Sequence, residues 1–311
     1  MAGEVIAVAS GKGGVGKTTT VVNLGVVLRR ADHTVALVDG DLGMANLGRL
    51  LGIDASTTLH DVLAGEATVE EAIVEEAPGF GVLAGSGELS SYPDAEPSGL
   101  RDVLETLAAD YEFVLVDTGA GMSHEDVLPL GLADRVVLVT TPEPASIGDT
   151  QKTAELADLA DGTIAGLVVT MADDGTDGRH IARQVGVELL GVVPYDPAVR
   201  ESTASATPLE ALDPDGPAAA AYRELAATLS GESIDTSARS PEPGEGPRER
   251  AGTEPPDEPG ATDDASAAGD TDAAGAPVDD GTAAEPAEHD GAGDAEGGSR
   301  GLLSRLGGLF G

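Results

Sequence analysis

The sequence predicts an α/β fold in which helices cover both faces of a mostly parallel sheet, giving three layers. Short Val-rich runs alternate with longer helical patterns up to about residue 229. Most of the runs are apolar without alternation, as expected for strands that are buried on both faces. Such a sheet places its ligand site at the carboxyl ends of the strands. The expected strands are 5–9, 35–38, 81–83, 113–116, 136–139, 164–169 and 189–193, and the clearest helical patterns are 19–30, 100–109, 150–160 and 218–229.

The charge of the chain is strongly acidic, with a formal net charge of -39 over 311 residues. From residue 231 onward there are 19 acidic residues and 5 arginines, so most of the charge lies in the expected folded part. An acidic surface argues against wholesale binding to nucleic acid, which requires a basic footprint. With three lysines and few aromatic residues, the composition resembles that of proteins from salt-in halophiles; an ordinary acidic protein is the alternative.

The absence of cysteine excludes disulfides, thiolate catalysis and cysteine-ligated metal centres. A cationic stretch followed by an apolar stretch does not occur at the N-terminus, so a signal peptide is not expected. Runs of about 18 apolar residues do not occur either, so a membrane span is not expected. We therefore expect a cytosolic protein, with peripheral attachment to the cytoplasmic membrane as a further possibility.

A glycine-rich phosphate-binding motif follows the first expected strand. The pattern G-x-x-x-x-G-K-[ST] is matched at every fixed position by Gly11, Lys12, Gly13, Gly14, Val15, Gly16, Lys17 and Thr18. Glycines let backbone N–H groups turn toward phosphate oxygens, and the helix that begins near Thr18 adds its N-terminal dipole. We expect Lys17 to reach the β- and γ-phosphates of a nucleotide and the Thr18 hydroxyl to bind Mg²⁺. A chance Gly-rich turn is disfavoured because a strand precedes the loop and a helix follows it.

Three carboxylates stand at the carboxyl ends of other expected strands. Asp39 and Asp41 end the second strand, and side chains at i and i+2 lie on the same side of an extended chain. They can hold a Mg²⁺ shell and orient a water molecule. Asp117 ends the strand 113–116, where it can bind Mg²⁺ directly or through water. Turn chemistry and helix capping are the structural alternatives for these residues.

The lysine after the first glycine indicates which family of phosphate-loop proteins the sequence resembles. Lys12, in the run K-G-G-V-G-K-T-T that ends at Thr19, resembles the deviant Walker A motif of the MinD/ParA ATPases. The resemblance covers about residues 4 to 230. It implies that Lys12 contacts nucleotide across the interface of an ATP-dependent dimer, and that Lys12, Lys17 and Asp41 serve catalysis.

The resemblance also assigns roles to the strand-end residues. It implies that Asp39 lies in the outer shell of the metal and that Asp41 positions the attacking water. Thr18 and Asp117 complete the Mg²⁺ site, and Asn46 matches an asparagine of the following segment.

Departures from the family pattern fall on both sides of the expected site. The family usually has Asp-x-Pro-Ala-Gly, beginning at the position of Asp117. Here the run from Asp117 to Gly121 is Asp-Thr-Gly-Ala-Gly, so the proline is missing, but Gly121 still offers an N–H to the γ-phosphate. Asp149 resembles an aspartate after the fifth strand. Pro194 and Asp196 resemble the adenine-side loop. The family's asparagine is absent, and Thr170-Met171 stands in its place, so base contacts are less defined than phosphate contacts.

The C-terminal third changes composition sharply. Residues 231–298 are mostly Gly, Ala, Pro, Asp, Glu, Ser and Thr, which predicts a disordered acidic linker after an ATPase domain of residues 1–230. The last segment, 299–311, projects one apolar face on a helix, made of Leu302, Leu303, Leu306, Leu309 and Phe310. Flanking arginines suit a bilayer interface, as does the resemblance to the membrane-targeting helix of this family. Docking of the segment on the protein's own core is the alternative.

These features predict a MinD-like ATPase that uses ATP and Mg²⁺, dimerises on ATP, binds the membrane surface and positions cell-division or other cell-surface machinery. An unidentified protein would stimulate hydrolysis or serve as cargo. A ParA-like partitioning ATPase or a flagellar or polar-organelle placement regulator is the alternative, although no basic DNA-binding surface is visible. The missing cysteines disfavour a metal-cluster scaffold, and Lys12 disfavours a small-molecule kinase.

Overall fold

The computed structural model describes residues 2–87, 97–121 and 123–234, all of which belong to one compact unit. Most of the predicted linker lies outside the described residues. So does the predicted amphipathic helix with Leu302, Leu303, Leu306, Leu309 and Phe310. Within the described residues, the structure contains no helix that is long and apolar enough to span a membrane.

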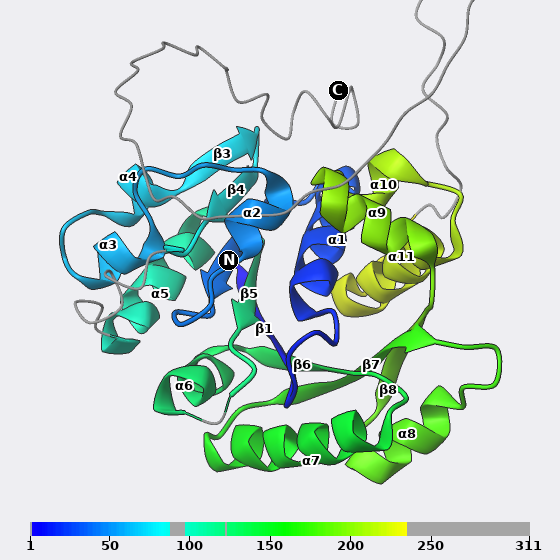
Figure 1. Cartoon of the computed structure of the whole chain (residues 1–311). Helices are drawn as coiled ribbons and strands as arrows, with labels where there is room; N and C mark the ends of the chain where they lie inside the picture. Colours follow the sequence, from blue (N-terminus) through cyan, green and yellow to red (C-terminus); the bar gives the residue numbers. More distant parts are fainter. Residues whose placement is uncertain (1, 88–96, 122, 235–311) are drawn as a thin grey trace, which may run out of the picture. The chain divides into compact units, whose positions relative to one another are not determined.

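An eight-stranded sheet runs through the middle of the unit, in the order β3-β4-β2-β5-β1-β6-β7-β8 (Figure 1). All neighbouring strands are parallel except β3 and β4, which pair antiparallel at one edge. The chain leaves β1 toward β2 on one side and later returns to β6 on the other. The crevice at this change of direction is where such sheets bind ligands. The strands are β1 (Glu4–Ala9), β2 (Val35–Gly40), β3 (Val74–Ala77), β4 (Phe80–Leu83), β5 (Phe113–Thr118), β6 (Arg135–Thr140), β7 (Ile164–Ala172) and β8 (Leu189–Pro194).

Helices cover both faces of the sheet. One face is packed against α1, α2, α10 and α11, whereas α3 to α8 pack against the other face. The helices are α1 (Lys17–Arg30), α2 (Leu47–Leu51), α3 (Leu59–Leu63), α4 (Val69–Ala72), α5 (Leu100–Asp110), α6 (His124–Leu132), α7 (Pro144–Leu159), α8 (Gly178–Val185), α9 (Pro197–Ser205), α10 (Leu209–Leu212) and α11 (Pro217–Ser230), with a 3-10 turn η2 (Pro97–Gly99) before α5.

The central strand explains the apolar runs of the sequence. Ile6 and Val8 of β1 pack toward α1 and α11, whereas Ala7 and Ala9 pack toward α6, α7 and α8. Because successive side chains of a strand point to opposite faces, a strand covered on both faces must be apolar at every position. The predicted three-layer fold with a mostly parallel sheet is therefore confirmed.

Two elements differ from the sequence prediction. The edge strand β3 was not predicted, because Glu75 and Glu76 interrupt its apolar pattern. Helix α7 begins at Pro144 and not near residue 150. Proline is compatible with the first turn of a helix, where its missing N–H would have no partner in any case.

Candidate functional site

The glycine-rich loop connects the end of β1 to the start of α1. Gly14 and Gly16 adopt φ values of 79° and 92°, a left-handed conformation that glycine takes readily. Gly16 is the N-cap residue of α1, which is 14 residues long. The loop therefore presents backbone N–H groups at the positive end of a long helix, which is an anion-binding arrangement.

A cavity of about 700 Å³ opens above this loop. We call one wall the P-loop side; of the predicted residues it contains Gly13, Gly14, Gly16, Lys17, Thr18, Thr19 and Asp41. Gly11, Lys12 and Val15, also predicted, do not line the cavity. The Val15 side chain is buried in the core, and a Cβ on Gly11 would come within 2.3 Å of the Asp149 carbonyl oxygen of α7. Gly11 thus permits close packing of the loop on α7.

Lys17 and Thr18 form the floor of the P-loop side. The Lys17 side chain lines the cavity although the residue is only 8% exposed, and it has no ion pair within the described residues. A buried ammonium group is unfavourable without an anion beside it, so this position suits a phosphate. The Thr18 hydroxyl donates to Asp117 Oδ2 at 2.5 Å, which links the start of α1 to the end of β5.

Asp39 and Asp117 are register partners at the ends of β2 and β5. Asp39 Oδ2 accepts hydrogen bonds from the N–H groups of Asn46 and Leu47, both at 2.9 Å. The Oδ1 atoms of Asp39 and Asp117 are buried and have no hydrogen-bond partner. Burial raises the pKa of Asp39 to about 6 and that of Asp117 to about 7, against the hydrogen bonds that lower them.

This arrangement fits a magnesium ion that arrives with phosphates. Orphaned carboxylate oxygens beside a threonine hydroxyl are the oxygen ligands that Mg²⁺ prefers. The described residues contain no group of three or more acidic or histidine side chains that could hold a metal alone. Mg²⁺ in phosphate sites is bound by one or two carboxylates and completed by phosphate oxygens and water. A cation here would also lower the raised pKa values of both aspartates.

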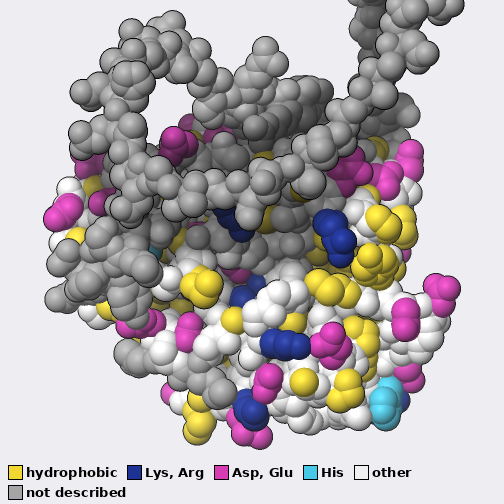
Figure 2. Space-filling model, viewed as in Figure 1, with side chains coloured by type: hydrophobic (Ala, Val, Ile, Leu, Met, Phe, Trp, Pro, Cys, Tyr) yellow, Lys and Arg dark blue, Asp and Glu magenta, His cyan; other side chains and the backbone are white. Residues whose placement is uncertain are grey.

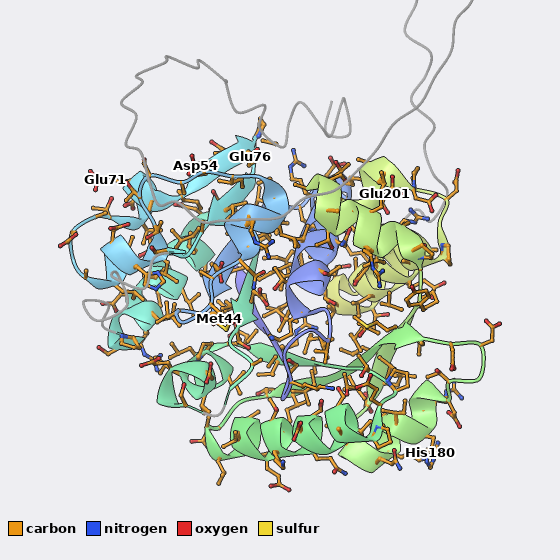
Figure 3. All side chains as sticks on the ribbon, in the orientation of Figure 1. Met44, Asp54, Glu71, Glu76, His180 and Glu201 are labelled. Carbon is orange, nitrogen blue, oxygen red and sulfur yellow. The ribbon has the colours of Figure 1, made fainter. Side chains whose placement is uncertain are left out.

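Asp41 lies at the edge of the same wall. Its Oδ1 atom accepts a hydrogen bond from Met44 N at 2.9 Å and lies 3.7 Å from the position of a Cβ on Gly119. Asp41, Met44, Ala45 and Asn46 all line the cavity, and Met44 is 78% exposed (Figure 3). The structure therefore brings Asp41 to the P-loop side, between the segments that follow β2 and β5.

The segment after β5 follows the prediction only in part. Ala120 lines the cavity, whereas Gly121 does not. A Cβ on Gly119 or Gly121 would collide with the Asp126 carboxylate, which accepts from Ser123 in the capping box of α6. The contact of the Gly121 N–H with a phosphate remains a prediction.

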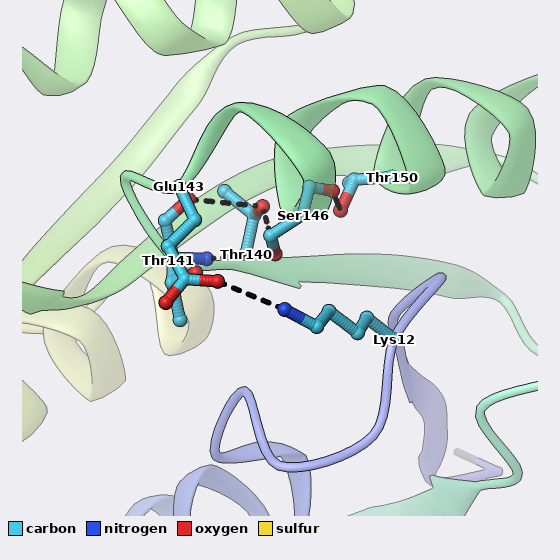
Figure 4. Close-up of polar contacts among 6 residues, drawn as sticks. All are labelled: Lys12, Thr140, Thr141, Glu143, Ser146 and Thr150. Atoms are coloured by element: carbon cyan, nitrogen blue, oxygen red, sulfur yellow. Dashed lines mark hydrogen bonds and ion pairs between the residues drawn. The ribbon is translucent and has the colours of Figure 1, made fainter.

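Lys12 points away from the cavity of its own chain. Its ammonium group lies 2.8 Å from Glu143 Oε2, just before α7, and its side chain is 44% exposed (Figure 4). The bond to Glu143 raises the pKa of Lys12 and lowers that of Glu143. Buried hydroxyls hold the start of α7 in place: Thr140 Oγ1 and Ser146 Oγ are 2.9 Å apart, and Ser146 Oγ accepts from Thr141 N. The pairing with Glu143 was not predicted.

The opposite wall, the β7–β8 side, is shaped mainly by apolar and aromatic groups. The residues it contributes to the cavity are Thr170, Met171, Val193, Pro194, Tyr195, Asp196, Val199, Arg200 and Thr203. Its polar groups are partly engaged elsewhere. Thr170 Oγ1 donates to the carbonyls of Val15 and Thr140, and Asp196 caps α9 by accepting from Ala198 N. Pro194 and Asp196 both line the cavity, where the Asp196 carboxylate caps α9. Their contact with a nucleotide remains a prediction.

Three further residues that line the cavity belong to no sequence motif. Arg49 of α2, Arg200 of α9 and Tyr222 of α11 line the cavity and were not predicted. On the face shown in Figure 2, several Lys and Arg side chains lie near the middle, with some Asp and Glu side chains beside them and others toward the margins. Positive charge near an anion site in an acidic chain favours a negatively charged ligand. Asp149 pairs with Lys152 at 2.9 Å on α7 and does not line the cavity.

Comparison with known proteins places this geometry in context. Residues 6–209 match the family model of the CobQ/CobB/MinD/ParA nucleotide binding domain. An uncharacterized ATP-binding protein of Methanocaldococcus jannaschii is 38% identical over 230 residues, which is 73% of this chain and 87% of that protein. The crystal structure of the Pyrococcus furiosus cell division ATPase MinD superposes with a TM-score of 0.70 at 36% identity, covering 74% of this chain and 99% of that chain. The septum site-determining protein MinD of Pyrococcus horikoshii, complexed with Mg-ADP, gives a TM-score of 0.69 at 34% identity, covering 73% and 95%.

Proposed function

We propose, from the premise that this chain belongs to the CobQ/CobB/MinD/ParA nucleotide-binding family, that it is a spatial regulator that cycles on and off a membrane surface. In this cycle ATP favours a dimer, the dimer binds the membrane and positions cell-division or other cell-surface machinery, and hydrolysis releases it. The chain is an ATPase with ATP and Mg²⁺ as substrate and cofactor. The two MinD proteins of similar structure, a cell division ATPase and a septum site-determining protein, support positioning as the output.

The residues on and next to the P-loop side have different roles in ATP hydrolysis. Thr18, Asp117 and Asp39 would hold Mg²⁺, which when bound neutralises phosphate charge and stabilises the charge that develops in the transition state. Lys17 and the loop N–H groups bind the phosphates. Asp41, close to the segment after β5, orients the water that attacks the γ-phosphate. Positioning and electrostatics account for most of the catalysis in phosphoryl transfer, so a fixed Asp41 matters as much as its charge.

The observation that carries the dimer proposal is the position of Lys12. It belongs to the phosphate loop, yet it lies outside the cavity of its own chain and is held by a single ion pair with Glu143. An ion pair between two exposed side chains contributes little to stability, so this contact is readily exchanged for another. A phosphate of the nucleotide bound to a second copy of the chain would replace Glu143 as the partner of Lys12. Lys12 would then contact ATP in the opposite subunit of the dimer.

The dimer is tested by light scattering of the full chain with ATP, with ADP and without nucleotide. We expect a dimer with ATP only, and a monomer for Lys12→Ala under all three conditions. Lys152→Ala is the matched control because it also removes an exposed, ion-paired lysine near α7. An ATP dimer that survives Lys12→Ala would remove the proposed role of this lysine.

The membrane part of the cycle depends on the predicted segment 299–311. A three-turn helix binds marginally alone, whereas two copies on one dimer gain from their effective concentration. Co-sedimentation with vesicles of anionic lipid should therefore require ATP and should be lost when residues 302–311 are deleted. Equal binding with ATP, with ADP and after the deletion would contradict membrane cycling. ATP-dependent binding to DNA at the same salt would instead favour the partitioning alternative.

A further inference from the structure

A buried histidine connects the segment that carries Asp41 to the rest of the fold. His60 lies on α3 and is only 1% exposed. Its Nε2 atom is 2.9 Å from the Leu42 carbonyl oxygen, and its Nδ1 atom accepts from Ser86 N at 3.0 Å. A backbone nitrogen can only donate, so Nδ1 carries no proton. The ring is therefore neutral, with its proton on Nε2, which donates to Leu42.

The residue that receives this bond follows Asp41 directly. The segment 41–47 is also held by Asp41, which accepts from Met44 N, and by Asp39, which accepts from Asn46 N and Leu47 N. Those bonds run to carboxylates of the site itself, whose partners would change when Mg²⁺ and nucleotide bind. The bond from His60 comes from α3, which does not line the cavity. It anchors the backbone beside Asp41 to a part of the fold outside the site.

The partner on the other side of the ring belongs to the segment after β4. Leu59 N donates to the Ala84 carbonyl at 2.8 Å, so the start of α3 is bound to this segment next to His60. A Cβ on Gly85 would lie 2.6 Å from Ala45 Cβ and 3.3 Å from Asp39 Cγ, so the segment after β4 presses against the segment 41–47. His60 thus joins three parts of the chain at one point.

We propose that His60 is a positioning residue for ATP hydrolysis, which fixes Asp41 through the carbonyl group of Leu42. This inference rests on the proposed function, in which Asp41 orients the attacking water. His60 makes no contact with the cavity, so nucleotide binding does not depend on it. Loss of the bond should lower kcat about 10- to 100-fold, as expected for a small misplacement of a catalytic group, with KM for ATP little changed.

Two substitutions separate the two bonds of the ring. In His60→Gln the amide nitrogen replaces Nε2 and still donates to Leu42, but the acceptor for Ser86 is lost. In His60→Asn the amide oxygen replaces Nδ1 and still accepts from Ser86, but the donor to Leu42 is lost. Each variant removes one of the two hydrogen bonds of the ring, so a purely structural role predicts similar losses in both. We expect single-turnover hydrolysis near the wild-type rate for His60→Gln and the reduced rate for His60→Asn.

Hydrogen exchange tests the same inference without nucleotide. Amides of the segment 41–47 should exchange faster in His60→Asn than in the wild type, and close to the wild-type rate in His60→Gln. His33→Asn is the matched control, because His33 is largely buried at the opposite end of β2, where it packs edge-on against Phe113. If His60→Asn does not fold, His60→Met, which fills the site without a donor, replaces it in both experiments.

The two experiments distinguish a failure of the inference about His60 from a failure of the proposed function. A wild-type chain without ATP hydrolysis would overturn the proposed function, while the exchange rates would still report on His60. Equal hydrolysis by the Gln and Asn variants, with equal exchange of the segment 41–47, would overturn the inference and leave the ATPase intact. A rise in KM at unchanged kcat would also overturn it, because His60 would then act on binding.

Discussion

The two sides of the cavity are built on different principles. The P-loop side consists of glycines, a buried lysine, two threonines and Asp41. The Thr18 hydroxyl is bonded to Asp117, and Asp117 and Asp39, the two carboxylates with orphaned oxygens, do not themselves line the cavity. The β7–β8 side combines exposed apolar groups, with Met171 45% and Tyr195 60% exposed, with the polar side chains of Thr170, Asp196, Arg200 and Thr203. Of these, Thr170, Asp196 and Thr203 already have hydrogen-bond partners. Both sides come from carboxyl ends of strands of the same sheet, so the difference lies in the loops and side chains that follow these strands and not in the sheet itself.

This difference fits the groups that we propose for the two sides, which are phosphates and Mg²⁺ on the P-loop side and the nucleotide base on the β7–β8 side. Phosphate and Mg²⁺ are charged, and only a few residue types at fixed positions can bind them in a buried site. The flat ring of a nucleotide base can be held by shape and apolar contact, which many combinations of residues provide. The P-loop side should therefore lose function sharply on single substitutions, whereas the β7–β8 side should change gradually.

The sharpest test of this contrast is Lys17→Ala. Removal of the buried ammonium group takes away the charge that faces the phosphates, and we expect ATP turnover to fall at least about 100-fold. Turnover under saturating ATP measures the effect. Lys152→Ala, which removes an exposed lysine paired with Asp149, should stay within about twofold of the wild type. Similar losses in the two variants would show that the P-loop side is not specially sensitive.

Asp117→Asn should make the nucleotide-free protein more stable while it weakens the effect of Mg²⁺ and ATP. The pKa of Asp117 is raised from 3.8 to about 7 by burial, so the unfolded chain ionises at lower pH than the folded one. Below about pH 4 the carboxyl group is protonated in both states and has no effect on their balance. Between about pH 4 and 7 its burial increasingly destabilises the nucleotide-free protein, and above pH 7 the loss reaches at most about 4 kcal/mol. Asp117→Asn should recover this free energy.

Urea unfolding at pH 5 and pH 8 measures that recovery. The variant should be more stable than the wild type at pH 8, with a smaller gain at pH 5, while Mg²⁺ and ATP should stabilise the wild type more than the variant. Asp158→Asn, at an exposed position of α7, should change the free energy of unfolding by less than about 0.5 kcal/mol at either pH. A pH-independent gain in the Asp117→Asn variant would argue against a buried, ionisable carboxyl group.

The same contrast governs what the sequence could predict. All strands except β3, the glycine-rich loop and the three aspartates follow from apolar runs and from a motif with fixed chemistry. The start of α7 does not, because its buried face carries Ser146, Thr150 and Thr153. The Thr150 hydroxyl donates to the Ser146 carbonyl, so polar side chains are buried without an apolar pattern. Long-range pairings such as His60 with Leu42 leave no local signal at all.

On the β7–β8 side, Tyr195→Ala should have a moderate effect. Loss of an exposed aromatic ring that lines the cavity removes contact area but no charge, so KM for ATP should rise by less than about tenfold at unchanged kcat. Steady-state kinetics with ATP measures both constants. A fall in kcat comparable to that of Lys17→Ala would break the proposed division between the two sides.

The smallest expected effect is at Met171, which adopts a φ of 52° at the end of β7. This left-handed conformation is unfavourable for a methionine and better tolerated by asparagine. Met171→Asn should therefore raise the free energy of unfolding by about 0.5–1 kcal/mol.

Met171→Asn also adds a side-chain amide to a wall whose Thr170 hydroxyl is already bonded to Val15 and Thr140. Nucleotide titrations should then show ATP gaining about two- to fivefold in affinity over GTP, because an amide can pair with both the amino group and the ring nitrogen of adenine. Met171→Ala is the control that removes the side chain without adding the amide. An affinity unchanged in both variants would mean that the base does not reach Met171, and the β7–β8 side would have to be reassigned.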